Sequence, residues 1–418
     1  MLSELFQWLD RQYDLPGAGL WNFISFRAGA GMVLSLFISM IFGKSAIRFL
    51  RSLQIGEDIR DLGLEGQLQK KGTPTMGGII IIMGIILPVL LVADLDNMYI
   101  VILLLVTSWM AVIGFVDDYI KVFRKNKEGL SGKAKVLGQV GCGLIVALAM
   151  LLSEDIVVRM DLERAENANY ELVGNPYLVR DAGGDMVEVV NTKALVTNLP
   201  FFKENLIDYS RILPLDGELA ETVSWVIFVL LVIFVITAVS NAANLTDGLD
   251  GLATGVSSIA VTTLGAFAYV SGNVILAGYL SVLYLPGAGE VFVYAACFLG
   301  ACTGFLWYNA YPAQVFMGDT GSLTLGGVIA AMALLLRKEW LLPVLCGVFV
   351  VENLSVIVQV SYFKYTKRKY GTGRRILLMS PLHHHYQKAG LPEAKIVTRF
   401  WIVSILLAVV TILTLKVR

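Results

Sequence analysis

Histidine, cysteine and charged residues are all scarce in this 418-residue chain. It has three His and four Cys, and its charged fraction is 16% against a hydrophobic fraction of 56%, with a mean hydropathy of +0.70. The shortage of charge excludes a soluble globular protein of average composition. The cysteines lie inside apolar runs without metal-ligand spacing, which excludes a disulfide framework and a cysteine-based metal site. The chain also lacks a Walker A sequence, which excludes a P-loop nucleotide site.

Long apolar runs are what the sequence does have. Many approach the ~20 residues that cross a bilayer, so the chain is predicted to be an all-α polytopic membrane protein. We expect ten spanning helices, at about 23–43, 77–93, 98–116, 135–152, 223–240, 252–271, 289–308, 322–336, 340–362 and 397–416. The apolar stretch 274–285 is short, and we interpret it as re-entrant or interfacial. An eleventh span there is the alternative, and it would reverse the orientation of everything that follows.

The distribution of Lys and Arg predicts the orientation. These residues concentrate in 44–76, 117–135 and 363–396, whereas the short segments of the opposite side hold few. The positive-inside rule therefore places these three segments in the cytoplasm and both termini outside. We divide the chain into 1–152, an outer insertion at 153–222 that we expect to be β-rich, and 223–418, with one catalytic membrane domain overall. A tolerated insertion without catalytic role is the plainer interpretation of 153–222, since long surface loops cost little.

The ten-span arrangement puts four polar clusters on the cytoplasmic side. They are FVDDY (115–119), NAANLTDGLDG (241–251), NAYPAQVFMGDTGS (309–322) and SPLHHHYQKAG (380–390). The eleven-span alternative would separate the first two clusters from the last two. Their convergence on one face therefore favours ten spans.

The aspartates of these clusters suit a hard cation. Asp117 and Asp118 end an apolar run, where an unpaired carboxylate is costly and usually functional; two solvated acids beside Lys121 are the alternative. Amide and carboxylate groups recur every third residue from Asn241 to Asp250, a spacing that lines one side of a helix and suits hydrated Mg²⁺. A capped turn with solvated acids is again the alternative. The segment lacks the register of a calcium loop.

Asp319 stands among glycines and hydroxyl residues in MGDTGS. Its setting suits Mg²⁺ ligation and phosphate binding, with Ser322 expected to cap the following helix, although a plain helix cap is also open. Asn309 and Phe316 offer hydrogen bonding and stacking for a base or sugar. Lys70 and Lys71 precede a Gly/Pro turn, and such lysines either contact phosphate or extend to lipid headgroups. Acids for a cation and lysines for phosphates together indicate diphosphate chemistry at a membrane surface.

All three histidines stand side by side as His383, His384 and His385. A metal site, a phosphate-handling site and an accident of loop composition are each compatible with such a run. Three adjacent side chains do not readily face one metal, and oxygen ligands suit Mg²⁺ better than zinc. We therefore interpret His383 as a hydrogen-bond donor to the diphosphate or a proton-transfer group, with its neighbours orienting the loop.

The motifs GTPTMGG, FVDDY, NLTDGLDG, FMGDTGS and especially SPLHHHYQKAG resemble those of the phospho-N-acetylmuramoyl-pentapeptide transferase family, within the polyprenyl-phosphate N-acetylhexosamine-1-phosphate transferase superfamily. The resemblance covers essentially all ten spans and fails over 153–222. It implies a Mg²⁺-dependent transfer of phospho-N-acetylmuramoyl-pentapeptide from UDP-N-acetylmuramoyl-pentapeptide to undecaprenyl phosphate, giving lipid I and UMP for peptidoglycan synthesis. It also implies a homodimer in the bacterial cytoplasmic membrane, in contact with membrane lipid and with no nucleic-acid partner.

The resemblance further implies roles for individual residues. Asp117, Asp118, Asp319 and His383 match catalytic positions, and Asp319 is the expected Mg²⁺ ligand. Nucleotide-sugar or other substrate-binding positions are matched by Lys70, Lys121, Lys133, Asn244, Asp247, Asn309, Phe316, His384 and His385.

Two mechanisms and two rival functions follow from the sequence. An aspartate attacks the β-phosphate and the lipid phosphate then displaces the enzyme, or the lipid phosphate attacks directly. We favour direct attack, because a phosphate monoester is largely dianionic near pH 7 and hardly needs a base. A sister transferase for UDP-N-acetylglucosamine would share the acids. A secondary transporter also carries acids near its spans, but we find no internal repeat.

Overall fold

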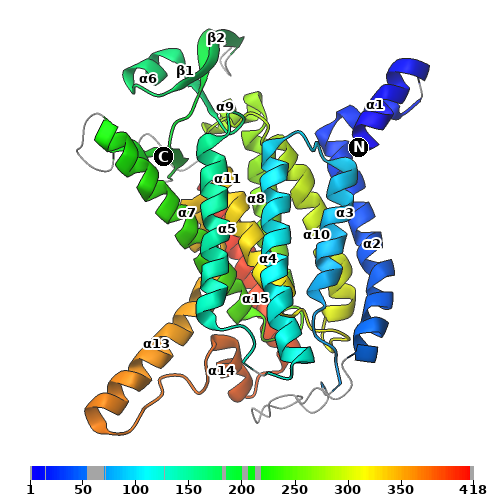
Figure 1. Ribbon diagram of the computed structural model, residues 1–418, viewed down its shortest axis with the longest axis vertical. Coiled ribbons are helices and arrows are strands. Elements are labelled where there is room, and N and C mark those ends of the chain that lie inside the picture. The colour runs from blue at the N-terminus through cyan, green and yellow to red at the C-terminus, as the bar shows by residue number, and fades with distance from the viewer. Residues whose placement is uncertain are drawn as a thin grey trace.

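The computed structural model describes residues 2–14, 16–53, 70, 72–126, 128–180, 185–199, 206–211 and 218–414. Roughly parallel helices form a bundle, with a small β-rich unit at one end and a helical arm at the other (Figure 1). The helices of the bundle and its two ends are α1 (Leu2–Tyr13), η1 (Ala18–Asn22), α2 (Ile24–Leu53), α3 (Gly78–Val92), α4 (Met98–Phe123), α5 (Gly132–Leu152), α7 (Glu218–Thr246), α8 (Leu252–Ser271), α9 (Val274–Leu280), α10 (Gly289–Asn309), α11 (Gly318–Leu335), η4 (Glu339–Leu341), α12 (Leu342–Leu345), α13 (Gly347–Tyr370), α14 (Leu382–Lys388) and α15 (Glu393–Leu413).

The prediction of an all-α polytopic membrane protein is confirmed. Within the described ranges, eight helices are long and apolar enough to cross a membrane, or nine when the bent pair Glu339–Leu345 and Gly347–Tyr370 counts as one span. The predicted span 77–93 corresponds to α3, whose 15 residues are fewer than the ~20 of an untilted span. The stretch 274–285 contains only the seven-residue α9, so it is too short for an eleventh span.

Helix α11 forms the centre of the bundle. Its residues from Thr320 to Leu335 are all buried, and it packs against α3, α4, α7 and α8. Small residues allow this close approach: a Cβ on Gly78 would overlap the backbone of Gly321, so the start of α3 lies directly on α11. The backbone N–H groups of Gly77 and Gly78 donate to the carbonyls of Phe316 and Met317, each at 2.8 Å. These bonds join the GTPTMGG and FMGDTGS motifs.

Three local predictions are wrong. Helix α4 does not end near Asp117 but continues to Phe123, because the Asp117–Lys121 pair and the stacked rings of Phe115, Tyr119 and Phe123 extend it past the apolar run. Ser322 does not cap α11: it lies one turn inside that helix, where its Oγ donates to the Gly318 carbonyl. The asparagine and aspartate series of 241–251 does not share one helix, since α7 ends at Thr246.

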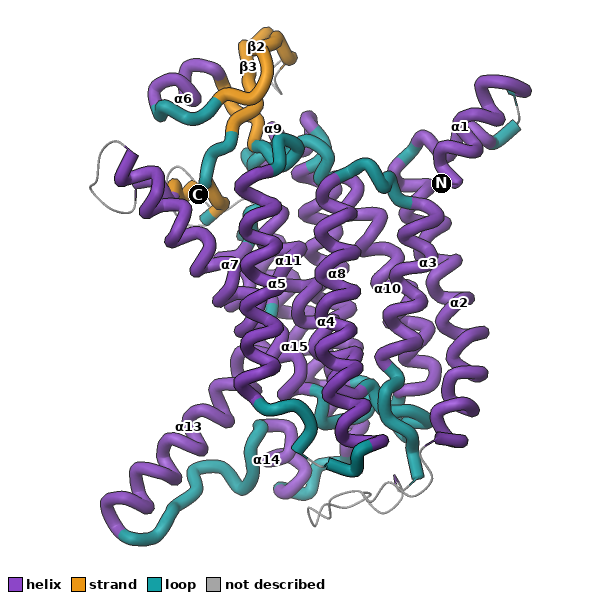
Figure 2. Tube along the Cα trace, in the orientation of Figure 1, coloured by secondary structure: helices purple, strands orange, loops and turns teal. Residues whose placement is uncertain are grey.

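The segment 153–222 contains the expected strands. They are β1 (Val158–Asp161), β2 (Leu172–Arg180), β3 (Met186–Thr192), β4 (Val196–Asn198) and β5 (Leu206–Asp208), with α6 (Leu162–Asn167) and η3 (Tyr209–Arg211) between or beside them. One antiparallel sheet has the order β1-β3-β2, with Val158 opposite Thr192, and β4 pairs with β5. Figure 2 shows these strands together at the end of the bundle opposite α14.

The β-rich unit packs on the turn that follows α11. The Tyr209 hydroxyl donates to Glu339 at 2.6 Å, and the Thr197 hydroxyl donates to the Arg337 carbonyl at 3.0 Å. Lys338 donates to the Asn198 side chain, and it is almost fully buried. The unit therefore covers the end of α11 that lies farthest from Asp319.

Candidate active site

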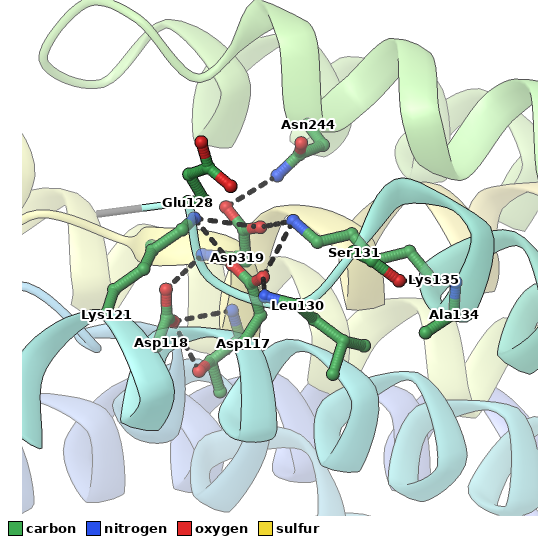
Figure 3. Close-up of polar contacts among 12 residues, drawn as sticks. Asp117, Asp118, Lys121, Glu128, Leu130, Ser131, Ala134, Lys135, Asn244 and Asp319 are labelled. Atoms are coloured by element: carbon green, nitrogen blue, oxygen red, sulfur yellow. Dashed lines mark hydrogen bonds and ion pairs between the residues drawn. The ribbon is translucent and has the colours of Figure 1, made fainter. Parts of the chain in front are cut away.

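Three carboxylates converge at the end of the bundle near α14. Asp117 and Asp118 come from α4 and Asp319 from the first turn of α11, and they offer ligand oxygens that all lie within 4.8 Å of one another (Figure 3). Close packing of the helices makes this possible, because a Cβ on Gly114 would overlap the Asp319 carbonyl. The two aspartate motifs, about 200 residues apart in sequence, thus form one cluster.

Asp118 caps helix α11 from a neighbouring helix. Its carboxylate accepts the backbone N–H groups of Asp319 and Thr320 at 3.1 and 2.8 Å, and the Thr320 hydroxyl at 2.6 Å. These N–H groups belong to the start of α11, where no intrahelical acceptor exists. Asp118 therefore fixes the backbone of the residue that carries the third carboxylate.

Two lysines bridge the other two carboxylates. Lys121 Nζ lies 2.5 Å from Asp117 and 3.2 Å from Asp319, and Lys135 Nζ lies 3.0 and 2.5 Å from the same two residues. The backbone N–H of Leu130 also donates to Asp117 at 2.7 Å, which fastens the loop between α4 and α5 over the cluster. Three carboxylates against two ammonium groups leave the cluster with an excess of negative charge.

The segment after α7 adds an amide and a fourth carboxyl group. Asn244 donates to Asp319 at 3.0 Å and to the Ser322 hydroxyl at 2.8 Å. Burial, together with the carboxylates of Asp319 and Asp118, raises the pKa of Asp247 to about 8. Asp247 is therefore mainly protonated at neutral pH in the absence of a nearby cation.

His383 is buried beside the same segment. Its Nδ1 is 3.1 Å from Glu352 of α13, and both side chains are fully buried. Its Nε2 is buried without a hydrogen-bond partner among the described residues, and it faces Gly248, where a Cβ would overlap it. Gly248 therefore allows the ring to approach the turn that carries Asp247.

The other two histidines have local partners. His384 Nδ1 lies 2.7 Å from the Gln387 side chain, and burial together with His383 lowers the pKa of His384 to about 4. His385 Nδ1 accepts the Leu378 N–H at 3.1 Å. Both side chains contact the segments next to them in sequence, whereas His383 faces the segment 241–251.

Lys70 lies in a second group of polar residues next to the first. Its Nζ contacts Asp250 at 2.7 Å and Glu393 at 2.6 Å, and lies 5.8 Å from the centre of the Phe316 ring. Asn309 accepts the Gly251 N–H at 3.1 Å and donates to the Val315 carbonyl at 3.0 Å. The segment 241–251 is therefore the common neighbour of the lysine, aspartate and histidine groups.

Not every predicted position lies at the cluster. Lys133 is exposed at the start of α5, while Lys135, two residues later, contacts the carboxylates. Lys71 is outside the described residues. The sequence reasoning also missed Glu352, although a lone acid in an apolar helix was a signal, because such a group is rarely found unpaired.

Comparison with known proteins identifies the family. A model of glycosyl transferase family 4 matches residues 189–337, and a phospho-N-acetylmuramoyl-pentapeptide-transferase signature matches residues 70–82. Proteins named phospho-N-acetylmuramoyl-pentapeptide-transferase are similar over the full length of both chains, at 55% identity in Flavobacterium psychrophilum and 53% in Parabacteroides distasonis. The chain belongs to the phospho-N-acetylmuramoyl-pentapeptide-transferase family. A third member, from Flavobacterium johnsoniae, is 52% identical over the same extent.

The signature of this transferase family includes Lys70 and the GTPTMGG motif, which the structure joins to the segment preceding Asp319. The donor set of the cluster fits a magnesium ion. Asp117, Asp118 and Asp319 offer only oxygen, the ligand type that Mg²⁺ prefers. Lys121 and Lys135 show that the same oxygens attract positive charge.

Proposed function

We propose that this protein transfers phospho-N-acetylmuramoyl-pentapeptide from UDP-N-acetylmuramoyl-pentapeptide to undecaprenyl phosphate, with release of UMP and formation of lipid I. The observation that carries the proposal is the convergence of Asp117, Asp118 and Asp319 beside Lys121 and Lys135. Carboxylates that hold a cation, next to ammonium groups, suit the binding of a diphosphate. The names of the relatives supply the identity of the transferred group, phospho-N-acetylmuramoyl-pentapeptide.

The proposed roles follow the contacts. Asp319, with Asp117 beside it, would hold Mg²⁺, and when bound the ion neutralises charge on the diphosphate. Lys121 and Lys135 would turn from the carboxylates toward phosphate oxygens. Asn244 orients Asp319, and Asp247 lies near both. Lys70 and Phe316, which lie close together, would contact the uridine end of the donor.

A lateral groove supports a lipid acceptor. It has a volume of about 620 Å³ and lies between α13, α14 and α15. Its lining is mostly apolar, with one cation, and comprises Gly347, Val348, Val351, Leu382, Tyr386, Leu391, Ile396, Arg399, Phe400, Ile402, Val403 and Leu407. Leu382 is adjacent to His383, so an isoprenoid chain in the groove would bring its phosphate toward the histidine.

Direct attack by the lipid phosphate is the mechanism we propose. An oxygen of the lipid phosphate bonds to the β-phosphorus, and the bond from that phosphorus to the bridging oxygen breaks, so that UMP leaves with the electron pair. Asp118 already accepts three hydrogen bonds, and Asp117 accepts the Leu130 N–H and would lie beside the cation, so we assign neither as the nucleophile. His383 Nε2 would face the diphosphate as a proton-transfer group, and would donate a hydrogen bond to it when Nε2 carries a proton.

We place the site on the cytoplasmic face of the bacterial cytoplasmic membrane and the termini outside, on the strength of the Lys and Arg distribution. The resemblance also supports a homodimer. Neither point affects the chemistry of the site.

The test is UMP release from purified protein with UDP-N-acetylmuramoyl-pentapeptide, a polyprenyl phosphate and Mg²⁺. We expect release that requires all three components and that is nearly abolished in Asp319→Asn at every Mg²⁺ concentration. A preference for UDP-N-acetylglucosamine as donor would instead identify the sister transferase. A folded protein that releases no UMP, or an Asp319→Asn variant with wild-type turnover, would contradict the proposal.

A further inference from the structure

Helix α13 projects from the bundle as an arm. It departs at 76° from the short helical segment before it, and after Gly371 the chain returns along it to α14 (Figure 1). We call residues 353–381 the α13 arm. Its tip lies at the same end of the molecule as α14, which carries His383.

Specific contacts hold the two limbs of the arm together. The Gln359 side chain accepts the N–H groups of Ile376 and Leu377, each at 3.0 Å, and the Thr366 hydroxyl accepts the Arg374 N–H at 2.8 Å. A Cβ on Gly373 would overlap the ring of Phe363, so the return segment lies directly against the helix. The arm is therefore an ordered hairpin.

All the charge on the arm is positive. It contains six cations and neither Asp nor Glu, and the cations are Lys364, Lys367, Arg368, Lys369, Arg374 and Arg375. All six are exposed, and no carboxylate of the described residues forms an ion pair with any of them. Lys369 and Arg374 lie 5.3 and 5.0 Å from the ring of Tyr370, so the cations are grouped around an aromatic tip. Six exposed cations that repel one another and form no ion pair within the described residues favour binding of an anionic partner.

The exposed apolar residues of the arm follow a fixed order. Along the helix, Leu354, Ile357, Val358 and Val360 come first, then Tyr362, Phe363, Tyr365 and Tyr370, and the cations lie among and after the aromatic residues. On the return segment, Ile376 and Leu378 are also exposed, and the Ile376 N–H donates to Gln359, so this segment returns to the aliphatic base. Aliphatic, aromatic and basic residues succeed one another in this way from the bilayer core to the headgroups. A water-soluble acidic partner would not account for the exposed aliphatic residues at the base of the arm.

We propose that the α13 arm binds the headgroups of anionic phospholipids in the leaflet next to the active site. The aliphatic base lies in the acyl region, the tyrosines lie at the interface, and the six cations contact phosphates. Only the identification of this leaflet as cytoplasmic rests on the proposed function. Because Glu352 directly precedes the arm and His383 follows it after Leu382, anchoring the arm also restrains the two ends of the His383–Glu352 contact.

The test measures lipid binding without catalysis. Full-length protein is reconstituted in phosphatidylcholine vesicles, and the motion-restricted fraction of spin-labelled phosphatidylglycerol is compared with that of spin-labelled phosphatidylcholine. In Lys367→Gln/Arg368→Gln/Lys369→Gln we expect the preference for phosphatidylglycerol to fall about fivefold or more, since each cation near the surface contributes to binding. In a second variant, Arg374→Gln/Arg375→Gln, we also expect the preference for phosphatidylglycerol to fall. High salt should weaken the preference of the wild-type protein, because it screens the cations.

The matched control is Lys44→Gln/Arg48→Gln/Arg51→Gln, which removes three exposed cations from the end of α2. This control variant should keep most of the wild-type preference for phosphatidylglycerol. An unchanged preference in both arm variants, or an equal loss in the control, overturns the proposal. Displacement of the labelled phosphatidylglycerol by a low mole fraction of polyprenyl phosphate also overturns it, because the cations would then belong to the acceptor site. None of these outcomes depends on UMP release.

Discussion

The imidazole of His383 and the carboxylate of Glu352 face each other in a fully buried contact, 3.1 Å from Nδ1 to Oε2. The backbone N–H of His383 donates to the same carboxylate at 3.1 Å. Because the carboxylate requires a proton on Nδ1, Glu352 orients the ring so that Nε2 faces the segment 241–251. Glu352 is thus a positioning residue for His383.

Replacing Glu352 by Gln should therefore lower kcat with little change in the KM of either substrate. An amide has one acceptor oxygen where the carboxylate has two, and it carries no negative charge toward the ring, so we expect a loss of about 10-fold or more. Steady-state kinetics in detergent measures it, and Glu352→Asp, which keeps the charge, should recover part of the activity. A Glu352→Gln variant whose loss lies entirely in KM would show that the residue does not act through His383.

The three histidine-to-alanine variants should differ in whether they change kcat, KM or stability. His383→Ala should lower kcat by ~10²–10⁴-fold, as expected for a positioned proton-transfer group or donor. His384→Ala and His385→Ala remove contacts to Gln387 and Leu378, so their effects should lie mainly in stability or KM. Equal and mild losses in all three variants would remove the assigned role of His383. Loss on strong chelation that zinc but not Mg²⁺ restores would indicate a zinc site instead.

Lys135 and Lys133 provide a contrast within one helix turn. Lys135→Gln removes an ammonium group that lies 2.5 Å from Asp319, so kcat should fall by about 10²-fold or more. Lys133 is exposed, and Lys133→Gln should retain kcat and raise the KM of the nucleotide-sugar donor. The same kinetic assay separates the two, and the reverse pattern would contradict the assignment of Lys135 to the carboxylate cluster.

The pH dependence of stability should report on Asp247. Its pKa of about 8 in the folded protein is above the ~3.9 of an unfolded Asp, so the folded state binds the extra proton between these values. The contribution of protonated Asp247 to the free energy of unfolding is therefore fully present below about pH 4 and is lost as the pH rises through about 8. Thermal unfolding without divalent cations should show a Tm that falls from pH 5.5 to 8.5, and Asp247→Asn should reduce the fall. An identical pH profile in the variant would refute the assignment.

The β-rich insertion lies at the far end of α11 from Asp319, which allows a clean deletion test. Replacing 153–222 by a Gly/Ser linker should leave kcat/KM within about tenfold, a barrier change near 1.4 kcal/mol. The Tm should nevertheless fall, because Glu339 and Lys338 lose their partners Tyr209 and Asn198. Tyr209→Phe, which removes one of these bonds, should produce a smaller fall. A monodisperse deletion variant with a much larger catalytic loss would place the insertion in the function of the site.

The sequence predicts where the helices lie well, but it predicts the bend before α13 and the side-chain contacts between helices poorly. Each of the ten predicted spans contains a helix, because the bilayer requires long apolar segments, and among the described residues eight or nine of them are long and apolar enough to cross it. The sharp bend before α13 lies inside one such run and leaves no mark in the hydrophobic pattern. Their charge and their place at the ends of apolar runs identified Asp117 and Asp319 as candidate site residues. The sequence spacing could not show that Lys135, and not Lys133, contacts the carboxylates, because this depends on how α5 is rotated against α4 and α11. Glu352 was overlooked because its partner lies 31 residues later, across the arm.

Helix α11 begins where a carboxylate from another helix caps it, and this affects how inactive variants are interpreted. Replacing Asp118 by Ala removes the acceptor of two backbone N–H groups and one hydroxyl, a change that costs about 0.5–2 kcal/mol for a typical cap. The same substitution releases the backbone of Asp319 from its present position. A loss of turnover in Asp118→Ala would thus reflect the displacement of Asp319 as well as the loss of the Asp118 carboxylate from the cluster. A genetic scan that ranks residues by lost growth would therefore not separate a chemical role of Asp118 from its role as the cap of α11.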